Sequence, residues 1–402
     1  MTELDVSQLL SVEAATRIVD AADLPRRIIR VAVGEAAGLR LAEEIRCDRD
    51  SPPFDKSLMD GFAVRSADLA RESADLIPQG KVAAGESARL PIKAGEIMAI
   101  MTGAPLPEGA DAVVPIEEAE VDRATGRVRI LRAASPGRFV TRRGSEAREG
   151  DIALGAGTRI GAAQVAVLAS VGKDTVLAYD RPAAAVLGNG DELVQIGTKP
   201  AGAQIRAANN AMLATLLHRW QCRTTDLGFV RDDPKLIRQS IERGLESDIL
   251  LISGGMSVGE RDYVPGILRE LGAEMKITKL RIKPGKPFIF ARMPGGKFVF
   301  GLPGNPLSAF VCAVTLIRRL IERWSGGEAG EWIRTAPLSL TLEANGPRQF
   351  YQPAIFDGRK IEPLAWKGSA DIFTLARANA LLVRPENQPA QSAGSAANFL
   401  EI

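Results

Sequence analysis

Residues 248–255 read DILLISGG, and this stretch decides the fold class. It is short, continuously apolar and closed by a glycine turn, as is typical of a strand buried on both faces. Similar runs alternate with helical ones in PAAAVLG (182–188), NNAMLATLLHRWQ (209–221), TTDLGFV (224–230), PKLIRQSIERGLES (234–247), YVPGILRELG (263–272) and KFVFGLPG (297–304). The alternation predicts an open, mostly parallel α/β sheet with helices on both faces and ligands at the carboxyl ends of its strands.

The chain on either side of this region follows other patterns. Residues 1–47 look helical and amphipathic, and 157–172 shows the same periodicity. Residues 58–146 break into short apolar pieces such as VVPIEEAEV and RVRIL, which predict a small β-rich domain. Residues 329–402 contain PLSLTLEA, QFYQPAIFDG, KIEPLAW and ALLVRP, which we expect to form a small β-barrel or sandwich.

Composition excludes several classes of protein. The chain has 402 residues, with 51 Lys and Arg against 49 Asp and Glu, so nothing favours a nucleic-acid or acidic-membrane surface. No run reaches the roughly 20 apolar residues of a membrane span. The start lacks a basic, then apolar, secretory pattern, and Cys47, Cys222 and Cys312 are too scattered for a disulfide framework. We therefore expect a cytoplasmic protein.

His218 is the single histidine, and it lies in the helical run 209–221. A packed or surface role fits it best, which removes histidine triads and multi-histidine metal sites. Acid, base and metal chemistry must therefore be carried by carboxylates and lysines.

Gly-rich turns follow two of the predicted strands. Val186–Leu193 reads VLGNGDEL and places Asp191 and Glu192 at a strand's carboxyl end, where backbone amides can meet phosphate and carboxylates can hold magnesium. Ser253, Gly254 and Gly255 repeat this arrangement on the strand that opened the section. A purely structural turn fits the first motif equally well.

Lysines gather in KLRIKPGKP, just before the strand KFVFGL and its turn Pro303–Ser308. If KLRIK is extended, Lys279 and Lys283 share one face, because strand side chains repeat every two residues. Two such ammonium groups would repel one another unless an anion lay between them. The residues alone thus indicate an anion or nucleotide site with possible magnesium assistance.

Three further runs, Asp55–Val64, Thr102–Pro107 and Arg142–Glu146, punctuate the region predicted to be β-rich. Each could hold a polar ligand, but each is more often a capped turn or a solvated loop.

Taken together, the motifs resemble the MoeA family of molybdopterin molybdenumtransferases, which includes the carboxyl-terminal domain of gephyrin. The resemblance covers nearly the whole chain in the family's order. It rests on PPFDKSLMDGFAV (52–64), TGAPLPEGADAVVP (102–115), RRGSEAREGD (142–151), GDEL (190–193), RDDP (231–234), SGGMSVGERDY (253–263), KPGKP (283–287) and GLPGNPLSA (301–309).

The resemblance implies a fold of several domains. These are a MogA-like α/β molybdopterin-binding domain (6–21 and 178–328), a β-rich domain (48–146), a connecting domain (22–47 and 147–177) and a C-terminal β-barrel (329–402). It also implies a cytoplasmic homodimer that inserts molybdate into adenylylated molybdopterin and releases AMP with the help of Mg²⁺. Its implied partners are a MogA-like adenylyltransferase and molybdoenzyme or chaperone acceptors, with no nucleic acid and no membrane.

The resemblance also implies site residues. The catalytic set would be Asp60, Thr102, Glu146, Glu192, Asp232 and Asp262. Substrate would be held by Lys279, Lys283, Lys286, Ser253, Gly254, Gly255, Pro303, Pro306 and Ser308. Magnesium would be held by Asp191, Glu192 and Asp262.

Several positions depart from the family's usual motifs. Lys56 and Leu58 replace Asn and Ala, Gly188 and Asn189 replace Ser-Thr, Glu146 replaces Asp, and an Asp-Ser/Thr-Asn run appears as Ala207-Ala208-Asn209. Losing a buried polar partner costs about 1–3 kcal/mol. An alternative is therefore a diverged carrier or scaffold that binds a pterin or nucleotide without turnover.

Overall fold

The computed structural model describes residues 9–69, 74–86, 88, 90–256, 263–329 and 332–402. The chain divides into two compact units. Unit 1 comprises Met1–Arg30, Gly38–Ala42 and Leu177–Ile402, and unit 2 comprises Val31–Ala37 and Glu43–Val176. Among the described residues, no helix combines the length and the apolar character needed to cross a bilayer.

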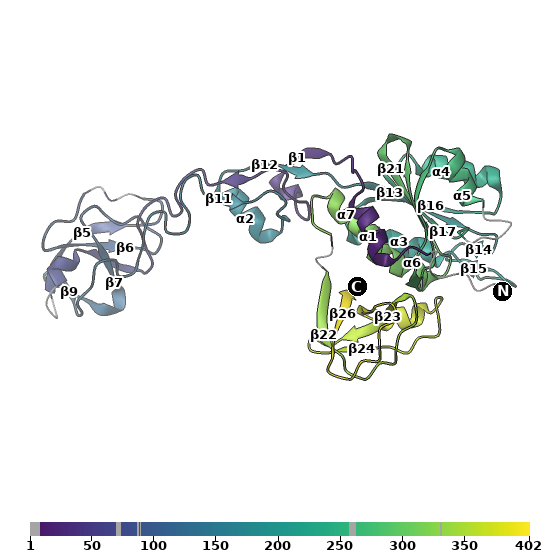
Figure 1. Cartoon of the computed structure of the whole chain (residues 1–402). Helices are drawn as coiled ribbons and strands as arrows, with labels where there is room; N and C mark the ends of the chain where they lie inside the picture. Colours follow the sequence, from purple (N-terminus) through teal and green to yellow (C-terminus); the bar gives the residue numbers. More distant parts are fainter. Residues whose placement is uncertain (1–8, 70–73, 87, 89, 257–262, 330–331) are drawn as a thin grey trace. The chain divides into compact units, whose positions relative to one another are not determined.

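Unit 1 is built on a six-stranded sheet, which confirms the predicted open, mostly parallel α/β architecture (Figure 1). The four strands at one side run parallel to one another, and the next strand in the order is antiparallel to them. In order across the sheet, the strands are β16 (Arg223–Val230), β13 (Ala183–Asn189), β17 (Ile249–Ser253), β21 (Lys297–Leu302), β20 (Pro287–Met293) and β18 (Glu274–Lys279).

Alternate side chains of this sheet enter two separate apolar cores, because successive strand residues point to opposite faces. Leu251 packs in one core and its neighbours Leu250 and Ile252 in the other. Helices α4 (Pro234–Gly244) and α5 (Val264–Glu270) cover the second core. The first is covered by α1 (Val12–Asp20), α3 (Ala208–Arg219), α6 (Pro306–Cys312), the π-helical turn η6 (Ala313–Ile317) and α7 (Arg318–Trp324).

The helix expected over residues 1–47 is much shorter in the structure. Within residues 9–47, which the structure describes, α1 is the one α-helix, and it begins after Ser11, whose hydroxyl accepts a hydrogen bond from the Ala14 amide at 3.1 Å. The rest contains strands β1 (Ile28–Ala32) and β2 (Ile45–Arg46) and the 3-10 turn η2 (Val33–Glu35). The prediction was wrong beyond Asp20, because β-branched residues in β1 favour extended backbone.

Unit 2 contains a second six-stranded sheet, which confirms the predicted β-rich character of this region. Its strands, in order, are β7 (Ala112–Pro115), β4 (Gly61–Val64), β6 (Glu96–Ile100), β5 (Ala74–Val82), β9 (Val128–Ile130) and β8 (Ala119–Val121). The short strands β3 (Lys56–Ser57) and β10 (Val140–Thr141) pair with each other, and β2 pairs with β11 (Ile152–Leu154). Helix α2 (Ala162–Ser170) lies where helical periodicity was expected.

The C-terminal part of unit 1 forms a further sheet around its own apolar core. Its order is β19 (Ile282–Lys283), β23 (Gln349–Phe356), β25 (Ala380–Arg384), β26 (Ala396–Glu401) and β22 (Ile333–Pro337), with β24 (Ile361–Pro363) paired to β23. A short helix, α8 (Ile372–Arg377), precedes β25. The expected strand PLSLTLEA is displaced, because β22 ends at Pro337 and Leu338 and Leu342 make only isolated bridges.

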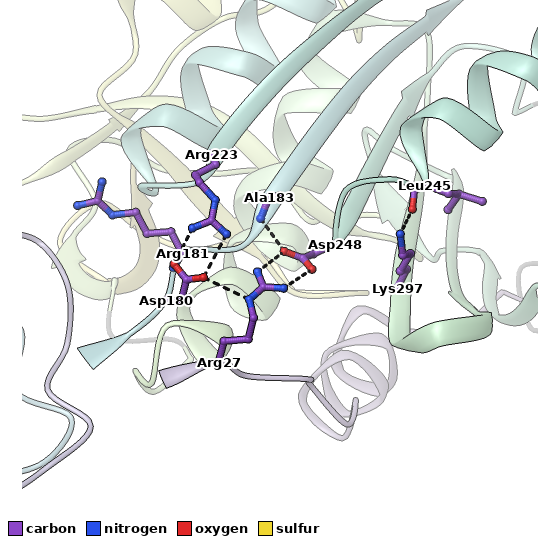
Figure 2. Close-up of polar contacts among 8 residues, drawn as sticks. All are labelled: Arg27, Asp180, Arg181, Ala183, Arg223, Leu245, Asp248 and Lys297. Carbon is purple, nitrogen blue, oxygen red and sulfur yellow. Dashed lines mark hydrogen bonds and ion pairs between the residues drawn. The ribbon is translucent and has the colours of Figure 1, made fainter. Parts of the chain in front are cut away.

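A charged network lies at the amino-terminal edge of the α/β sheet (Figure 2). Arg27 makes two hydrogen bonds to Asp248, of 2.9 and 2.7 Å, and one of 3.2 Å to Asp180. Arg223 binds the same Asp180 carboxylate at 2.6 and 3.1 Å. Asp248 also accepts the Ala183 amide at 2.7 Å, and nearby Lys297 donates to the Leu245 carbonyl. This network ties the segment around Arg27 to the amino-terminal edge of the sheet.

Candidate functional site

Three neighbouring parallel strands bring their carboxyl ends together in unit 1. Gly188 of β13 is in register with Ser253 of β17, and Ser253 is in register with Leu302 of β21. The amide of Gly254 then donates to the Leu302 carbonyl at 3.0 Å. As predicted, the Gly-rich turns after these strands lie at one edge of the sheet.

Two adjoining cavities, of about 240 and 510 Å³, occupy this edge. They share Asn189, Glu192, Gly254 and Gly304. The smaller is also lined by Gly190, Asp232, Gly255, Met256, Pro287 and Pro303. The larger is also lined by residues that include Asn209, Ser253, Asn305, Pro306, Ala370 and Ile372. Below, these two cavities together are called the strand-end cleft.

Glycine is required at the turn after β17. Gly254 and Gly255 have φ angles of +97° and +68°, which side-chain-bearing residues rarely adopt. A Cβ on Gly254 would lie 2.2 Å from the Asn189 carbonyl oxygen, and one on Gly255 would lie 2.8 Å from Asn189 Nδ2. The two glycines therefore let the turn pack directly against Asn189.

Asn189 links the end of β13 to the turn after β16. Its side-chain amide donates to Asp232 Oδ1 at 2.7 Å, and the Asp232 amide donates to Asp191 Oδ1 at 3.2 Å. Asn189 is 4% exposed, and its Oδ1 has no hydrogen-bond partner among the described residues. These bonds gather two of the predicted acidic residues around one buried amide.

Asn209, at the start of α3, makes a corresponding link. Its amide nitrogen donates to Ser253 Oγ at 2.8 Å and to the Gly304 carbonyl at 2.7 Å. Its Oδ1 is also buried and has no partner among the residues described. An unpaired buried acceptor costs free energy, so a ligand N–H or O–H that reached it would bind favourably.

Gly188 explains one departure from the family's motif. A Cβ at this position would lie 2.8 Å from Asn210 Oδ1 and 3.0 Å from Phe229 Cβ. Asn210 is held in place because its amide donates to Asp226 at 2.9 Å and to the Gly228 carbonyl at 2.7 Å. Serine would not fit here without displacing Asn210 or Phe229, so Gly188 is matched to its surroundings.

The lysines do not lie on one strand, so the condition of the paired-ammonium argument is not met. Lys279 ends β18 of the α/β sheet, whereas Lys283 lies in β19 and pairs with Phe350 of the C-terminal sheet. The chain bends at Arg281 between them. Lys283 Nζ lies 4.6 Å from the centre of the Phe350 ring. Lys279, Lys283 and Lys286 lie outside the residues that line the strand-end cleft.

In unit 2, Asp60 and Thr102 form one hydrogen-bonded pair. Asp60 Oδ1 accepts the Thr102 amide at 2.7 Å and the Thr102 hydroxyl at 2.8 Å. The amide bond, followed by the hydroxyl bond, lowers the pKa of Asp60 below its ordinary value. The carboxylate is thus kept ionised and oriented in an exposed turn.

Glu146 is held by two partners in the same unit. Ser51 Oγ donates to Glu146 Oε2 at 2.8 Å, and Lys56 Nζ donates to Oε1 at 3.4 Å. The Ser51 bond, then the Lys56 bond and charge, lower the pKa of Glu146. Lys56, which replaces the family's usual Asn, therefore contacts the acid that replaces its usual Asp.

The remaining predicted residues are distributed as follows. Pro303 and Pro306 line the cleft, whereas Ser308 is buried within α6 and does not. Asp262 lies outside the described residues. Within the part of the chain that is described, no group of three His, Cys, Asp or Glu side chains is placed to hold a metal alone.

Sequence reasoning missed the linking role of the amides that hold the cleft together. Asn189 and Asn209 were noted only as departures from the family's motifs, and Asn305 only as part of the turn Pro303–Ser308. Asn305 Nδ2 donates to Ser369 Oγ at 2.8 Å, and the Leu307 amide donates to the Ser369 carbonyl at 3.1 Å. The segment around Ser369 thereby joins the C-terminal sheet to the cleft. For Asn189 and Asn305 the available signal was an asparagine within a Gly- or Pro-rich turn, whereas Asn209 lies at the start of α3 and had no such signal.

The fold and site define a class: an α/β ligand-binding domain with its cleft at the carboxyl edge of the sheet, joined to a C-terminal β domain and a β-rich unit. Three family descriptions match successive regions. They are "MoeA N-terminal region (domain I and II)" over 10–172, "Probable molybdopterin binding domain" over 185–323 and "MoeA C-terminal region (domain IV)" over 335–402.

Individual relatives agree with these matches. The molybdopterin molybdenumtransferase 1 of Mycobacterium tuberculosis is 36% identical over 333 residues, which cover 78% of each chain. The molybdopterin molybdenumtransferase of Haemophilus influenzae is 30% identical and covers 95% of this chain and 96% of its own. A solved structure of the molybdopterin biosynthesis MoeA protein of Pyrococcus horikoshii OT3 is 25% identical, with a TM-score of 0.84 over 98% of this chain and 100% of that one. The chain belongs to the MoeA family of molybdopterin molybdenumtransferases.

Proposed function

We propose that this chain completes the molybdenum cofactor by inserting molybdate into adenylylated molybdopterin, with release of AMP. The observation that carries the proposal is the strand-end cleft. There, Gly-rich turns and acidic side chains meet two amide oxygens that have no hydrogen-bond partner among the described residues, at the edge of an α/β sheet. Such an edge is where open α/β sheets bind nucleotides and related anions.

The chemistry assigned to the protein is positioning and charge neutralisation. Water attacks phosphorus, the pyrophosphate-type P–O bond of the substrate breaks, and AMP leaves while the pterin keeps its own phosphate. The two dithiolene sulfurs bind molybdenum in place of one molybdate oxygen, which leaves as water with the two thiol protons. Lys279, Lys283 and Lys286 would bind the oxyanion, while Ser253, Gly254, Gly255, Pro303 and Pro306 would line the pterin and phosphate site. No protein nucleophile is required, because holding the reacting groups together and neutralising charge both lower the barrier.

Mg²⁺ is part of this proposal. The donors available near the cleft are carboxylates, which suit Mg²⁺, and an ion held by one or two carboxylates takes further ligands from phosphate and water. Asp191, Glu192 and Asp262 would hold it, with Asp191 already bound to the Asp232 amide. When bound, the ion would neutralise charge on the phosphate oxygens as the P–O bond breaks.

Asp60, Thr102, Glu146 and Asp232 complete the proposed catalytic set. Asp60 and Glu146 have lowered pKa values, so both are ionised at neutral pH and can accept hydrogen bonds or bind cations but cannot donate a proton. We propose orienting roles for them. The proposal also retains a cytoplasmic homodimer that receives substrate from a MogA-like adenylyltransferase and delivers product to molybdoenzymes or their chaperones.

The test is AMP release by the purified chain with adenylylated molybdopterin, molybdate and Mg²⁺. We expect release that depends on molybdate and is lost when chelator removes the divalent cation. A chain that binds the pterin substrate at saturation but releases no AMP would contradict the proposal and favour the carrier alternative.

A further inference from the structure

A cation and two aromatic rings form a corner on the C-terminal sheet. Lys283 Nζ lies 4.6 Å from the centre of the Phe350 ring and 5.9 Å from that of Trp366. The ring centres lie 5.3 Å apart with an interplanar angle of 36°. Lys283, Phe350 and Trp366 are called the aromatic corner below. An ammonium group at these distances is attracted by the negative faces of both rings.

The pairing of β19 with β23 creates this corner. Lys283 and Phe350 are register partners in the parallel ladder, so their side chains share one face of the sheet. Phe350 is 5% exposed, and Lys283 and Trp366 are half-buried. The lysine is thus held by backbone pairing on one side and by aromatic packing on the other.

Lys283 forms no ion pair with a carboxylate of the described residues, where the ion-paired lysines are Lys56 and Lys276. A second cation, Arg384, lies 5.8 Å from the Phe350 ring and donates to two uncharged acceptors, Gln352 Oε1 and the Glu343 carbonyl. An aromatic face holds an ammonium group without cancelling its charge, whereas a carboxylate would compete with any incoming anion. The corner therefore keeps its positive charge available.

The aromatic corner is connected to the strand-end cleft through a short segment. Trp366 lies three residues before Ser369, which binds Asn305 at 2.8 Å, and Ala370 lines the larger cavity. The segment that carries one ring of the corner thus also forms part of the cleft.

We propose that Trp366 and Phe350 are positioning residues for oxyanion binding: their rings hold the Lys283 ammonium group, un-neutralised, for a tetrahedral oxyanion such as molybdate. This inference rests on the proposed function for the identity of the anion. The rings act through Lys283 and do not contact the reacting atoms.

The test compares Trp366→Phe, which keeps an aromatic face, with Trp366→Leu, which keeps only apolar bulk. Molybdate binding to the full chain is measured by equilibrium dialysis at constant ionic strength. We expect Trp366→Leu to weaken binding about threefold to tenfold and Trp366→Phe to stay within about twofold of the unmodified chain. Phe350→Leu should behave as Trp366→Leu does.

Phe356→Leu is the matched control, because Phe356 lies on the same strand as Phe350 but packs against Phe399, with ring centres 4.7 Å apart. It should leave molybdate affinity unchanged. In AMP release, Trp366→Leu should raise KM for molybdate and leave KM for the pterin substrate unchanged, a split that general destabilisation would not produce.

Equal molybdate affinity in Trp366→Leu and the unmodified chain would overturn the inference, as would equal weakening in Trp366→Phe and Trp366→Leu. These outcomes are separate from failure of the proposed function, which is the absence of AMP release by the unmodified chain. Dialysis requires no turnover, so it decides the inference in either case.

Discussion

At the scale of single residues, the departures from the family's motifs have local physical partners. Gly188 makes room for Asn210 and Phe229, and Lys56 binds Glu146. The sequence raised the question of whether the substitutions leave a working site. For Gly188 and Lys56 the answer is favourable, because both residues fit the side chains around them.

Gly188→Ser should destabilise unit 1 although serine is usual at this position of the motif. The added Cβ would lie 2.8 Å from Asn210 Oδ1, and overpacking of this kind typically costs about 1–3 kcal/mol. Denaturant unfolding measures the change. Gly197→Ser is the control, since no atom lies within 4 Å of the Cβ it would add. Equal stability of the two variants would show that the surroundings of Gly188 relax freely.

Thr102→Val should shift the ionisation of Asp60. The variant removes the hydroxyl bond and retains the amide bond, so the pKa of Asp60 should rise toward its ordinary value without reaching it. A lowered pKa keeps the carboxylate charged as pH falls, so raising it makes the charge disappear at higher pH. We expect the acid limb of the pH–activity profile to move to higher pH.

The matched control for this shift is Thr335→Val, which removes an exposed hydroxyl bond of 2.8 Å to Asn398 in the C-terminal sheet. It should leave the profile unchanged. An unchanged acid limb in Thr102→Val would mean that Asp60 does not control activity in that pH range.

At the scale of helices and strands, periodicity predicted the α/β sheet well, because buried parallel strands and amphipathic helices have local signatures. It did not predict the break within KLRIK, where Lys283 pairs with Phe350, a partner far along the chain. Nor did it limit the first helix to α1, since the pairing that extends residues 28–32 and 45–46 is not local. The Gly-rich turns could be predicted from the sequence. The contacts of the asparagines that link them could not, because these contacts depend on how the ends of β13, β16, β17 and β21 meet in the folded sheet.

The network at the amino edge of the sheet should contribute stability that depends on pH. Burial opposes ionisation of Asp180, but its bonds to Arg223 and Arg27 outweigh this effect and lower its pKa. The stability is therefore present above the ordinary Asp pKa near 4 and is lost as pH falls through the lowered value. Asp180→Asn should lower stability at pH 7 by about 1–3 kcal/mol.

Thermal unfolding across pH tests this expectation. The difference between Asp180→Asn and the unmodified chain should narrow below pH of about 4. Glu13→Gln is the control, because it removes only an exposed i,i+4 ion pair with Arg17, a kind of pair worth a few tenths of a kcal/mol. A difference that stays constant down to acid pH would show that the Asp180 charge is not responsible.

At the scale of the whole molecule, the family match extends across residues 10–172, 185–323 and 335–402, so both units belong to one kind of enzyme. The proposed homodimer gives a simple expectation. Light scattering coupled to size exclusion should report twice the chain mass of 42.9 kDa. A mass that stays at one chain over the micromolar range would contradict the dimer and leave the family assignment intact.

The central claim is that the strand-end cleft binds the substrate's nucleotide and pterin parts while Lys279, Lys283 and Lys286 bind the oxyanion. A crystal structure of the full chain with AMP and molybdate, measured at the molybdenum absorption edge, tests it most directly. The account predicts AMP among Asn189, Gly254 and Gly304, and an anomalous molybdenum peak beside Lys279 or Lys283. Ligand density at a different surface, such as the roughly 580 Å³ hollow lined by Lys235, Arg238 and Glu270 of α4 and α5, would contradict it.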